Sequence, residues 1–168
     1  MPRDVQLNVL LPRNRDHPGW IRVEINGTSQ TEFHVLGRGS TTVNGKPTST
    51  HPSLSPFAHA GNTPTGNYVS PGIVSTTDWS RNSYGLWGAI RLKAVAGDAV
   101  LAQDVFGRKG LLIHGGIPGR FDGYRSTLGC LRVSDSDMRL LIKLISNAGD
   151  NAQAARCEGV SVRVTVRE

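Results

Sequence analysis

Two residues in this sequence, His114 and Cys130, have the types and surroundings that thiol-based acyl transfer needs. Cys130 lies shortly before a segment with helical spacing, where N–H groups and the positive end of a helix favour the thiolate. A free thiol with a pKa of about 8.5 is only slightly ionised at neutral pH, so a neighbouring imidazole is its usual activator. His114 follows the apolar run 111–113 and precedes two glycines. It is therefore expected where a buried strand opens into a loop that faces a cleft.

The chain next to the cysteine is suited to stabilising an acyl intermediate. Gly129 lets the backbone turn tightly, and the N–H groups around Cys130 are then candidates for binding the oxyanion of a tetrahedral intermediate. The plainer interpretation of His114 and Cys130 is a hydrogen-bonded core histidine and a small buried hydrophobe. The pair by itself leaves both interpretations open.

The elements that position these residues are expected to be mostly strands. Alternating apolar residues predict an N-terminal meander with strands near 5–9, 21–25 and 33–35, with the turn pair Asn26-Gly27 closing the second. Residues 37–66, rich in Gly, Ser, Thr and Pro, are expected to form a long ordered loop. Further strands are expected at 68–74, 89–95, 100–105, 111–113 and 160–166.

One helix is predicted, over residues 134–148. Ser134 is a good N-cap, and Asp137 stands three residues later as in a capping box. Apolar residues recur behind them at helical spacing: Met138, Leu141, Leu144 and Ile145. The expected fold is mainly β, a sandwich of two packed sheets with this one main helix after the cysteine.

Length and composition narrow the function classes. A chain of 168 residues favours a single domain, 1–168, and no stretch approaches the roughly 18 apolar residues of a membrane-spanning helix. The net charge of +6 suits a polyanionic partner, but the basic residues are scattered and form no nucleic-acid module. No cofactor is expected. A metal site is not expected either, because four histidines lack ligand spacing: His17, His34, His51 and His59.

The second cysteine, Cys157, stands in a different context, just before the last expected strand. It is interpreted as a structural thiol. A disulfide with Cys130, which would switch the enzyme off, is the minor alternative.

The segment around His114 and Cys130 resembles the signature of the L,D-transpeptidase catalytic domain. In that signature a His-Gly pair is followed by a loop and then by Ser/Thr, Gly-Cys and an apolar-Arg pair. Here these are His114-Gly115 and residues 126–132, Ser-Thr-Leu-Gly-Cys-Leu-Arg. A similar upstream element is Thr-Pro-Thr-Gly-Asn-Tyr at 63–68. The chain departs from the family at Leu128, where a histidine is common.

The resemblance implies an enzyme acting on the stem peptides of bacterial peptidoglycan. In the family, the thiolate attacks the carbonyl of the third stem residue, a diamino acid, at its L-centre and expels the terminal D-alanine. Carried over, Cys130 is the nucleophile, His114 is first base and then acid, and Gly115 orients the imidazole through its carbonyl. Attack on the acyl-enzyme by an amine gives transpeptidation or D-amino-acid exchange, and attack by water gives L,D-carboxypeptidase activity.

Four further residues are carried over as substrate-binding candidates. Arg132 either braces the loop or meets a substrate carboxylate. Ser126 and Thr127 position the loop by hydrogen bonds or act as local caps, and Gly129 shapes the turn.

Residues 107–116, with the compact loop that follows, resemble the small family branch that includes toxins delivered by type VI secretion machines. The polar N-terminus lacks a signal, so secretion without a standard signal peptide is expected, with action in the periplasm of a target cell. An immunity protein and secretion machinery would then be partners. The alternatives are a signal-stripped housekeeping cross-linking enzyme and a non-catalytic peptidoglycan-binding module of the same fold. A papain-like protease is disfavoured, because its cysteine precedes its histidine.

Overall fold

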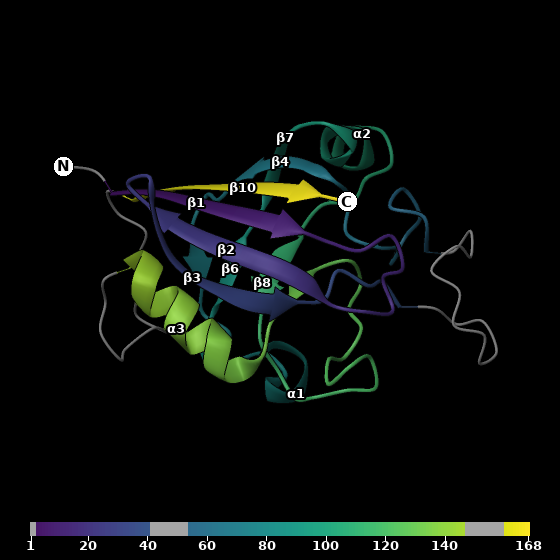
Figure 1. Ribbon diagram of the computed structural model, residues 1–168. Helices are drawn as coiled ribbons and strands as arrows, with labels where there is room; N and C mark the ends of the chain where they lie inside the picture. Colours follow the sequence, from purple (N-terminus) through teal and green to yellow (C-terminus); the bar gives the residue numbers. More distant parts are fainter. Residues whose placement is uncertain (1–2, 41–53, 147–159) are drawn as a thin grey trace.

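Two stacked β-sheets form the centre of the molecule in the computed structural model, which describes residues 3–40, 54–146 and 160–168 (Figure 1). The larger sheet has six strands in the order β3-β2-β1-β10-β4-β7, and the smaller has four in the order β5-β6-β8-β9. The strands are β1 (Arg3–Leu10), β2 (Gly19–Ile25), β3 (Thr28–Val35), β4 (Gly66–Val69), β5 (Ile73–Val74), β6 (Ala89–Arg91), β7 (Lys93–Ala96), β8 (Leu112–His114), β9 (Leu131–Arg132) and β10 (Val160–Arg167). The helices are α1 (Arg81–Tyr84), α2 (Asp98–Asp104) and α3 (Asp135–Ser146).

Both sheets are mixed. The parallel pairs are β1 with β10 in the larger sheet and β8 with β9 in the smaller one, and the other pairs are antiparallel. The prediction of a mainly β fold with two packed sheets and one main helix is confirmed.

The N-terminal meander follows directly from local sequence. Asn26 and Gly27 both have positive φ, 50° and 78°, as a two-residue hairpin turn of the primed type requires. In β1 and β2 the odd-numbered positions from Val5 to Val9 and from Ile21 to Ile25 are buried, and they face the second sheet. The predicted strands and their turn are confirmed.

The last strand lies in the middle of the larger sheet. β10 pairs with β1 on one side and β4 on the other, and Val162, Val164 and Val166 are buried. The predicted half-buried C-terminal strand is confirmed, and it joins the two ends of the described chain in one sheet (Figure 1).

Helix α3 lies where the sequence placed it. The Ser134 hydroxyl accepts a hydrogen bond from the Asp137 N–H at 3.1 Å, as an N-cap does. Its buried side chains complete the core at one end of the sandwich: Met138, Leu141, Ile142 and Ile145. The expected end near residue 148 lies outside the described residues.

Two expected strands are each divided between the two sheets. Within 68–74, β4 belongs to the larger sheet and β5 to the smaller, and within 89–95 the same holds for β7 and β6. The first break falls at Pro71-Gly72, where proline has no N–H to donate and Gly72 has a φ of 152°. The crossings carry the chain from one layer to the other.

The prediction of a strand at 100–105 is wrong. Residues 98–104 form α2, with Asp98 in its first turn and Ala99 and Ala102 buried one helical turn apart. The apolar residues that suggested alternation are largely exposed instead, among them Leu101 and Val105. The small alanine side chains let this helix lie close to β4 and β7. The alternation of apolar residues in the sequence does not reveal this packing.

The long loop expected at 37–66 is described only at its ends, since 41–53, with His51, lie outside the described residues, as does Cys157. The two ends are held together: the Gly39 N–H donates to Asn62 Oδ1 at 3.0 Å, and the Thr63 N–H donates to the Gly37 carbonyl at 3.1 Å. No helix in the described ranges is both long and apolar enough to span a membrane.

Candidate active site

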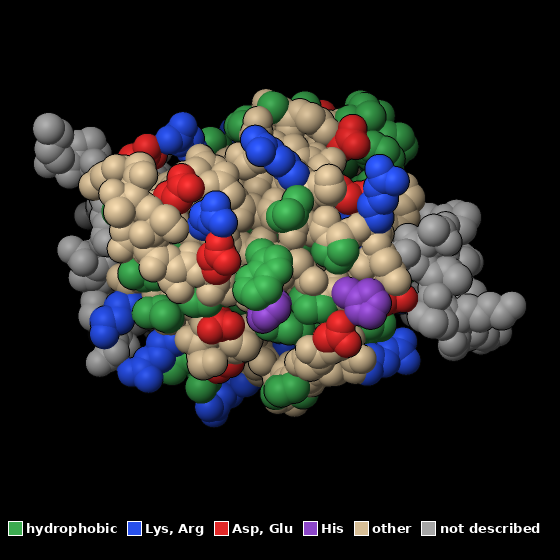
Figure 2. All heavy atoms as spheres, viewed as in Figure 1, with side chains coloured by type: hydrophobic (Ala, Val, Ile, Leu, Met, Phe, Trp, Pro, Cys, Tyr) green, Lys and Arg blue, Asp and Glu red, His purple; other side chains and the backbone are tan. Residues whose placement is uncertain are grey.

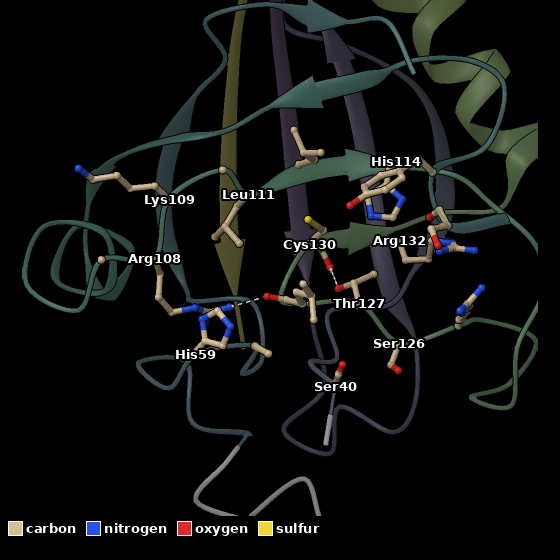
Figure 3. A pocket seen from close by; sticks show the side chains of 18 of the residues that line it. Ser40, His59, Arg108, Lys109, Leu111, His114, Ser126, Thr127, Cys130 and Arg132 are labelled. Atoms are coloured by element: carbon tan, nitrogen blue, oxygen red, sulfur yellow. Dashed lines mark hydrogen bonds between the residues drawn. The ribbon is translucent and has the colours of Figure 1, made fainter. Parts of the chain in front are cut away.

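Strands β8 and β9 bring the two predicted catalytic residues together. They pair in parallel, with Ile113 opposite Leu131 and His114 opposite Arg132. Side chains alternate along a strand, so Ile113 and Leu131 enter the core between the sheets, whereas His114 and Cys130 lie on the opposite, outer face of the smaller sheet. Both line one cavity of about 460 Å³ (Figure 3).

The imidazole of His114 is held in one orientation. Its Nδ1 lies 2.8 Å from the Gly115 carbonyl oxygen, which can only accept, so Nδ1 carries the proton and Nε2 has a free lone pair. Tyr84 packs beside the ring, with centroids 4.9 Å apart. Gly115 thus occupies the position expected of it.

Burial keeps His114 neutral. Only 2% of the residue is exposed, and burial lowers its pKa to about 4. The Gly115 hydrogen bond opposes this shift, and the positive charge of Arg132 adds to it. At neutral pH the residue is therefore a proton acceptor.

Cys130 is also neutral, against the expectation from its place near a helix. β9 and two further residues separate it from α3, and burial raises the pKa of the thiol. A hydrogen bond from the Leu112 backbone and the charges of Arg108 and Arg132 lower that pKa, but less than burial raises it. The expected thiolate stabilisation by the helix start is wrong, and a thiol and a neutral imidazole form the resting pair.

The residues before Cys130 are fixed by hydrogen bonds. Thr127 Oγ1 donates to the Cys130 carbonyl at 2.9 Å and accepts from the Gly129 N–H at 3.1 Å. Thr63 Oγ1 donates to the Gly129 carbonyl at 2.7 Å, which connects the upstream 63–68 segment to the cysteine turn. The Gly129 amide is therefore already occupied and is not free to bind an oxyanion.

Arg132 braces the surroundings of the site. Its guanidinium donates to the carbonyls of Ser83 at 2.9 Å and Ile117 at 2.6 Å, and the residue is 2% exposed. Burial lowers its pKa to about 10. Of the two roles considered for Arg132, this geometry matches bracing.

Sequence reasoning missed Arg108, one of the scattered basic residues. Its guanidinium donates to the carbonyls of Asn62 at 2.7 Å and of Gly61 and Leu128 at 3.0 Å, joining the 56–62 segment to the cysteine turn. A Cβ on Gly129 would lie 1.9 Å from the Arg108 Nη2 atom, so this position requires glycine. The only sequence signal was a basic residue in a glycine-flanked turn, 107–110.

The cavity is positively charged. Arg108, Lys109, Arg125 and Arg132 line it together with the exposed His59, and none of the aspartates and glutamates in the described ranges does. Ser126, predicted as a substrate contact, also lines it and is half-buried. Such a lining suits a substrate with free carboxylates. Among the described residues there is no group of three His, Cys, Asp or Glu side chains that could hold a metal ion.

The aromatic residues near the site divide into two kinds. Tyr84 lines the cavity, and Trp79 packs on Tyr84 with ring centroids 5.0 Å apart. Tyr68 is a core residue whose hydroxyl donates to the Pro64 carbonyl at 2.6 Å, and burial raises its pKa.

Comparison with known proteins gives a likeness of fold. No protein-family model matches the sequence, and no curated protein is similar enough to be matched to it. Among solved structures, the chain is similar to Bd1075 of Bdellovibrio bacteriovorus, with 13% identity, a TM-score of 0.50, and coverage of 96% of this chain and 47% of that one. The two chains share a fold.

L,D-transpeptidases are among the other solved structures that the chain resembles. For the enzyme of Xylanimonas cellulosilytica the identity is 15% and the TM-score 0.48, covering 97% of this chain and 60% of that one. For L,D-transpeptidase 1 of Mycobacterium tuberculosis the identity is 12% and the TM-score 0.41, covering 98% and 63%. This chain thus spans less than two thirds of the length of these structures.

Proposed function

We propose that this protein is a thiol-dependent acyl-transfer enzyme of the L,D-transpeptidase type that acts on peptidoglycan stem peptides. The observation that carries the proposal is the β8–β9 pairing, which sets Cys130 beside a His114 whose Nε2 is unprotonated, on one basic cavity. The resemblance of 126–132 to the L,D-transpeptidase signature supplies the substrate class. The hydrogen bond from Thr63 to the Gly129 carbonyl joins the two segments that resemble the family, 63–68 and 126–132, and this contact supports the proposal.

In this proposal the reaction begins from the neutral pair. As Cys130 Sγ attacks the carbonyl carbon of the third stem residue, its proton passes to His114 Nε2. The oxyanion forms beside the guanidinium charges that already act on Cys130, those of Arg108 and Arg132. The C–N bond to the terminal D-alanine then breaks, and the imidazolium protonates the leaving amine.

The second half-reaction starts from a thioester and again needs a base. His114, neutral once more, removes a proton from the amine of a second stem, from a D-amino acid or from water. The incoming atom attacks the thioester carbonyl, the C–S bond breaks, and the imidazolium returns its proton to Cys130 Sγ. Transpeptidation, exchange and trimming differ only in this acceptor.

Mass spectrometry of muropeptides incubated with the purified protein tests the proposal. Tetrapeptide stems should become tripeptide, D-amino-acid-exchanged or cross-linked products. The Cys130→Ala variant should form none of them, and His114→Ala should form them far more slowly because the base is gone.

The matched control is Cys157→Ser, which removes the other thiol and should leave turnover close to wild type. Equal turnover by the wild type and the Cys130→Ala variant would end the proposal. So would the failure of wild-type protein to form an acyl-enzyme or product with any stem, which would instead favour a binding module.

A further inference from the structure

The outer face of the larger sheet has a second hollow, away from the active-site cavity. This outer groove has a volume of about 500 Å³ and is formed by residues of β1, β2, β3 and β10. Figure 2 views this face, where hydrophobic and histidine side chains lie in the middle among charged side chains of both signs. The groove is lined by Asn8, Val9, Leu10, Trp20, Arg22, Glu32, Thr165 and Arg167.

Strand register arranges the groove as two adjoining rows. In one row Trp20 lies between Leu10 and His34, and Arg167 lies beyond Leu10 on β10. In the next row, two positions along each strand, the neighbours are polar: Glu32, Arg22, Asn8 and Thr165. The exposed apolar side chains of Leu10 and Trp20 thus adjoin a line of hydrogen-bonding groups.

Trp20 is the centre of the apolar row. It is 48% exposed, a large exposure for a tryptophan on a regular strand. The His34 ring stacks against it with centroids 3.9 Å apart, and His34 does not line the groove. The indole thus contacts the His34 ring, which is tilted by 34° to it, and the indole also lines the groove.

The polar row is close to charge-balanced. Arg22 and Glu32 form an ion pair at 2.7 Å, and the one further charge in the described lining, Arg167, lies in the other row opposite Leu10. Asn8 Oδ1 and Thr165 Oγ1 each accept a hydrogen bond from Gln6 Nε2, at 3.3 and 3.2 Å. Within the described chain, neither Asn8 Nδ2 nor Thr165 Oγ1 donates a hydrogen bond.

We propose that the outer groove binds the glycan strand of peptidoglycan, an inference that rests on the proposed function for the identity of the polysaccharide. A pyranose ring has an apolar C–H face that stacks on an indole, and its edge carries hydroxyl and amide groups for the polar row. A polyanion needs several unpaired cations along its length, and the described lining offers only Arg167 beyond the Arg22–Glu32 ion pair. An apolar protein surface fits less well, because the polar row would lose water without partners.

The groove and the active site lie on opposite outer faces of the two-sheet sandwich. Cys130 faces away from the core on the smaller sheet, and Trp20 faces away from it on the larger. One repeat unit of peptidoglycan therefore does not occupy both the outer groove and the active-site cavity. The glycan in the groove belongs to a strand next to the one whose stem enters the cavity, so the groove holds the enzyme within a multi-stranded wall.

Binding of peptide-free glycan strands to the Cys130→Ala protein tests the proposal, because it requires no catalysis. Isothermal titration calorimetry with glycan strands released by amidase should show saturable binding. Trp20→Ala should lower the affinity at least about tenfold, and Trp20→Tyr, which keeps a ring, should stay within a few-fold of the parent. The matched control is Trp79→Ala, which removes an exposed tryptophan elsewhere and should bind glycan like the parent.

The other outcomes overturn the proposal. They are no binding to the parent protein, equal binding by Trp20→Ala with its fold verified by circular dichroism, displacement of glycan by a sulfated polyanion, and Trp20-dependent dimerisation in sedimentation. Turnover of a sugar-free stem tetrapeptide by wild-type protein is measured alongside. If the proposed function fails, glycan binding remains without turnover, and if the groove assignment fails, turnover remains without glycan binding.

Discussion

The buried neutral imidazole of His114 makes the stability of this protein depend on pH in a predictable window. Its pKa is lowered from 6.5 to about 4, mainly by burial. Between these values the unfolded chain binds a proton at this position and the folded protein does not. The stabilising contribution of neutral His114 to the free energy of unfolding is therefore fully present above pH 6.5. It is lost as the pH falls through the pKa of His114 in the folded protein. At about 1.4 kcal/mol per pKa unit, the whole shift corresponds to about 3 kcal/mol.

Urea unfolding of the wild type and a His114→Gln variant, from pH 4 to 7, measures this contribution. Gln keeps a polar group near Gly115 but does not titrate. The difference in free energy of unfolding between the two proteins should rise by about 3 kcal/mol in favour of the wild type as the pH increases through the window. Other titrating groups cancel in the difference.

Cys130→Ala is the control, because the raised thiol pKa lies outside the window and the slope should persist. A difference between wild type and His114→Gln that stays constant from pH 4 to 7 would refute the argument that burial sets the state of His114.

Four other outcomes are expected. The acid limb of kcat/KM should lie near pH 4 rather than 6.5, since only the neutral imidazole accepts the thiol proton, and a pH–rate profile checks this. Alkylation of Cys130 by iodoacetamide, followed by peptide mass mapping, should keep accelerating above pH 9, and a plateau near pH 7 would contradict it. Gly129→Ala should lose about 1–3 kcal/mol in urea unfolding, because φ is 110° and Arg108 Nη2 occupies the Cβ position. Export to the periplasm with an added signal should change muropeptide composition only when Cys130 is intact, whereas cytoplasmic expression should not change it.

Elements whose cause is local were predictable from the sequence. The Asn26-Gly27 turn needs only two residues that tolerate positive φ, and the strands on either side need only alternation. The Ser134 cap and the apolar spacing behind it place α3 within a residue of its observed start. No knowledge of distant segments enters any of these.

Elements decided by distant packing were not predictable. Residues 98–104 form a helix because Ala99 and Ala102 fit against β4 and β7, a surface that no window of sequence contains. The division of 68–74 between the sheets depends on which neighbour each half pairs with. Whether such a segment is a helix or a strand, and which sheet it joins, depends on contacts with distant parts of the chain.

The active site also has features that the sequence predicts and features that depend on distant contacts. The types and order of His114 and Cys130 were visible in the sequence, but their protonation was not. Proximity to a helix start suggested a thiolate, whereas burial raises the pKa of the thiol. Arg108 was missed because its role lies entirely in hydrogen bonds to backbone carbonyls, which leave no side-chain pattern in the sequence.

With a pKa of about 4, the neutral imidazole of His114 is a weak base and its imidazolium is a strong acid. In the reaction proposed above, transfer of the Cys130 proton leaves a thiolate and an imidazolium in a buried site. The charge of Arg132 stabilises the thiolate and raises the energy of the imidazolium. The thiolate is consumed as the C–S bond forms, so the imidazolium remains as a strong acid beside the departing amine. Leaving-group protonation is therefore downhill, and the energetic cost falls on the initial proton transfer, where the Leu112 hydrogen bond and the Arg108 charge favour the developing thiolate.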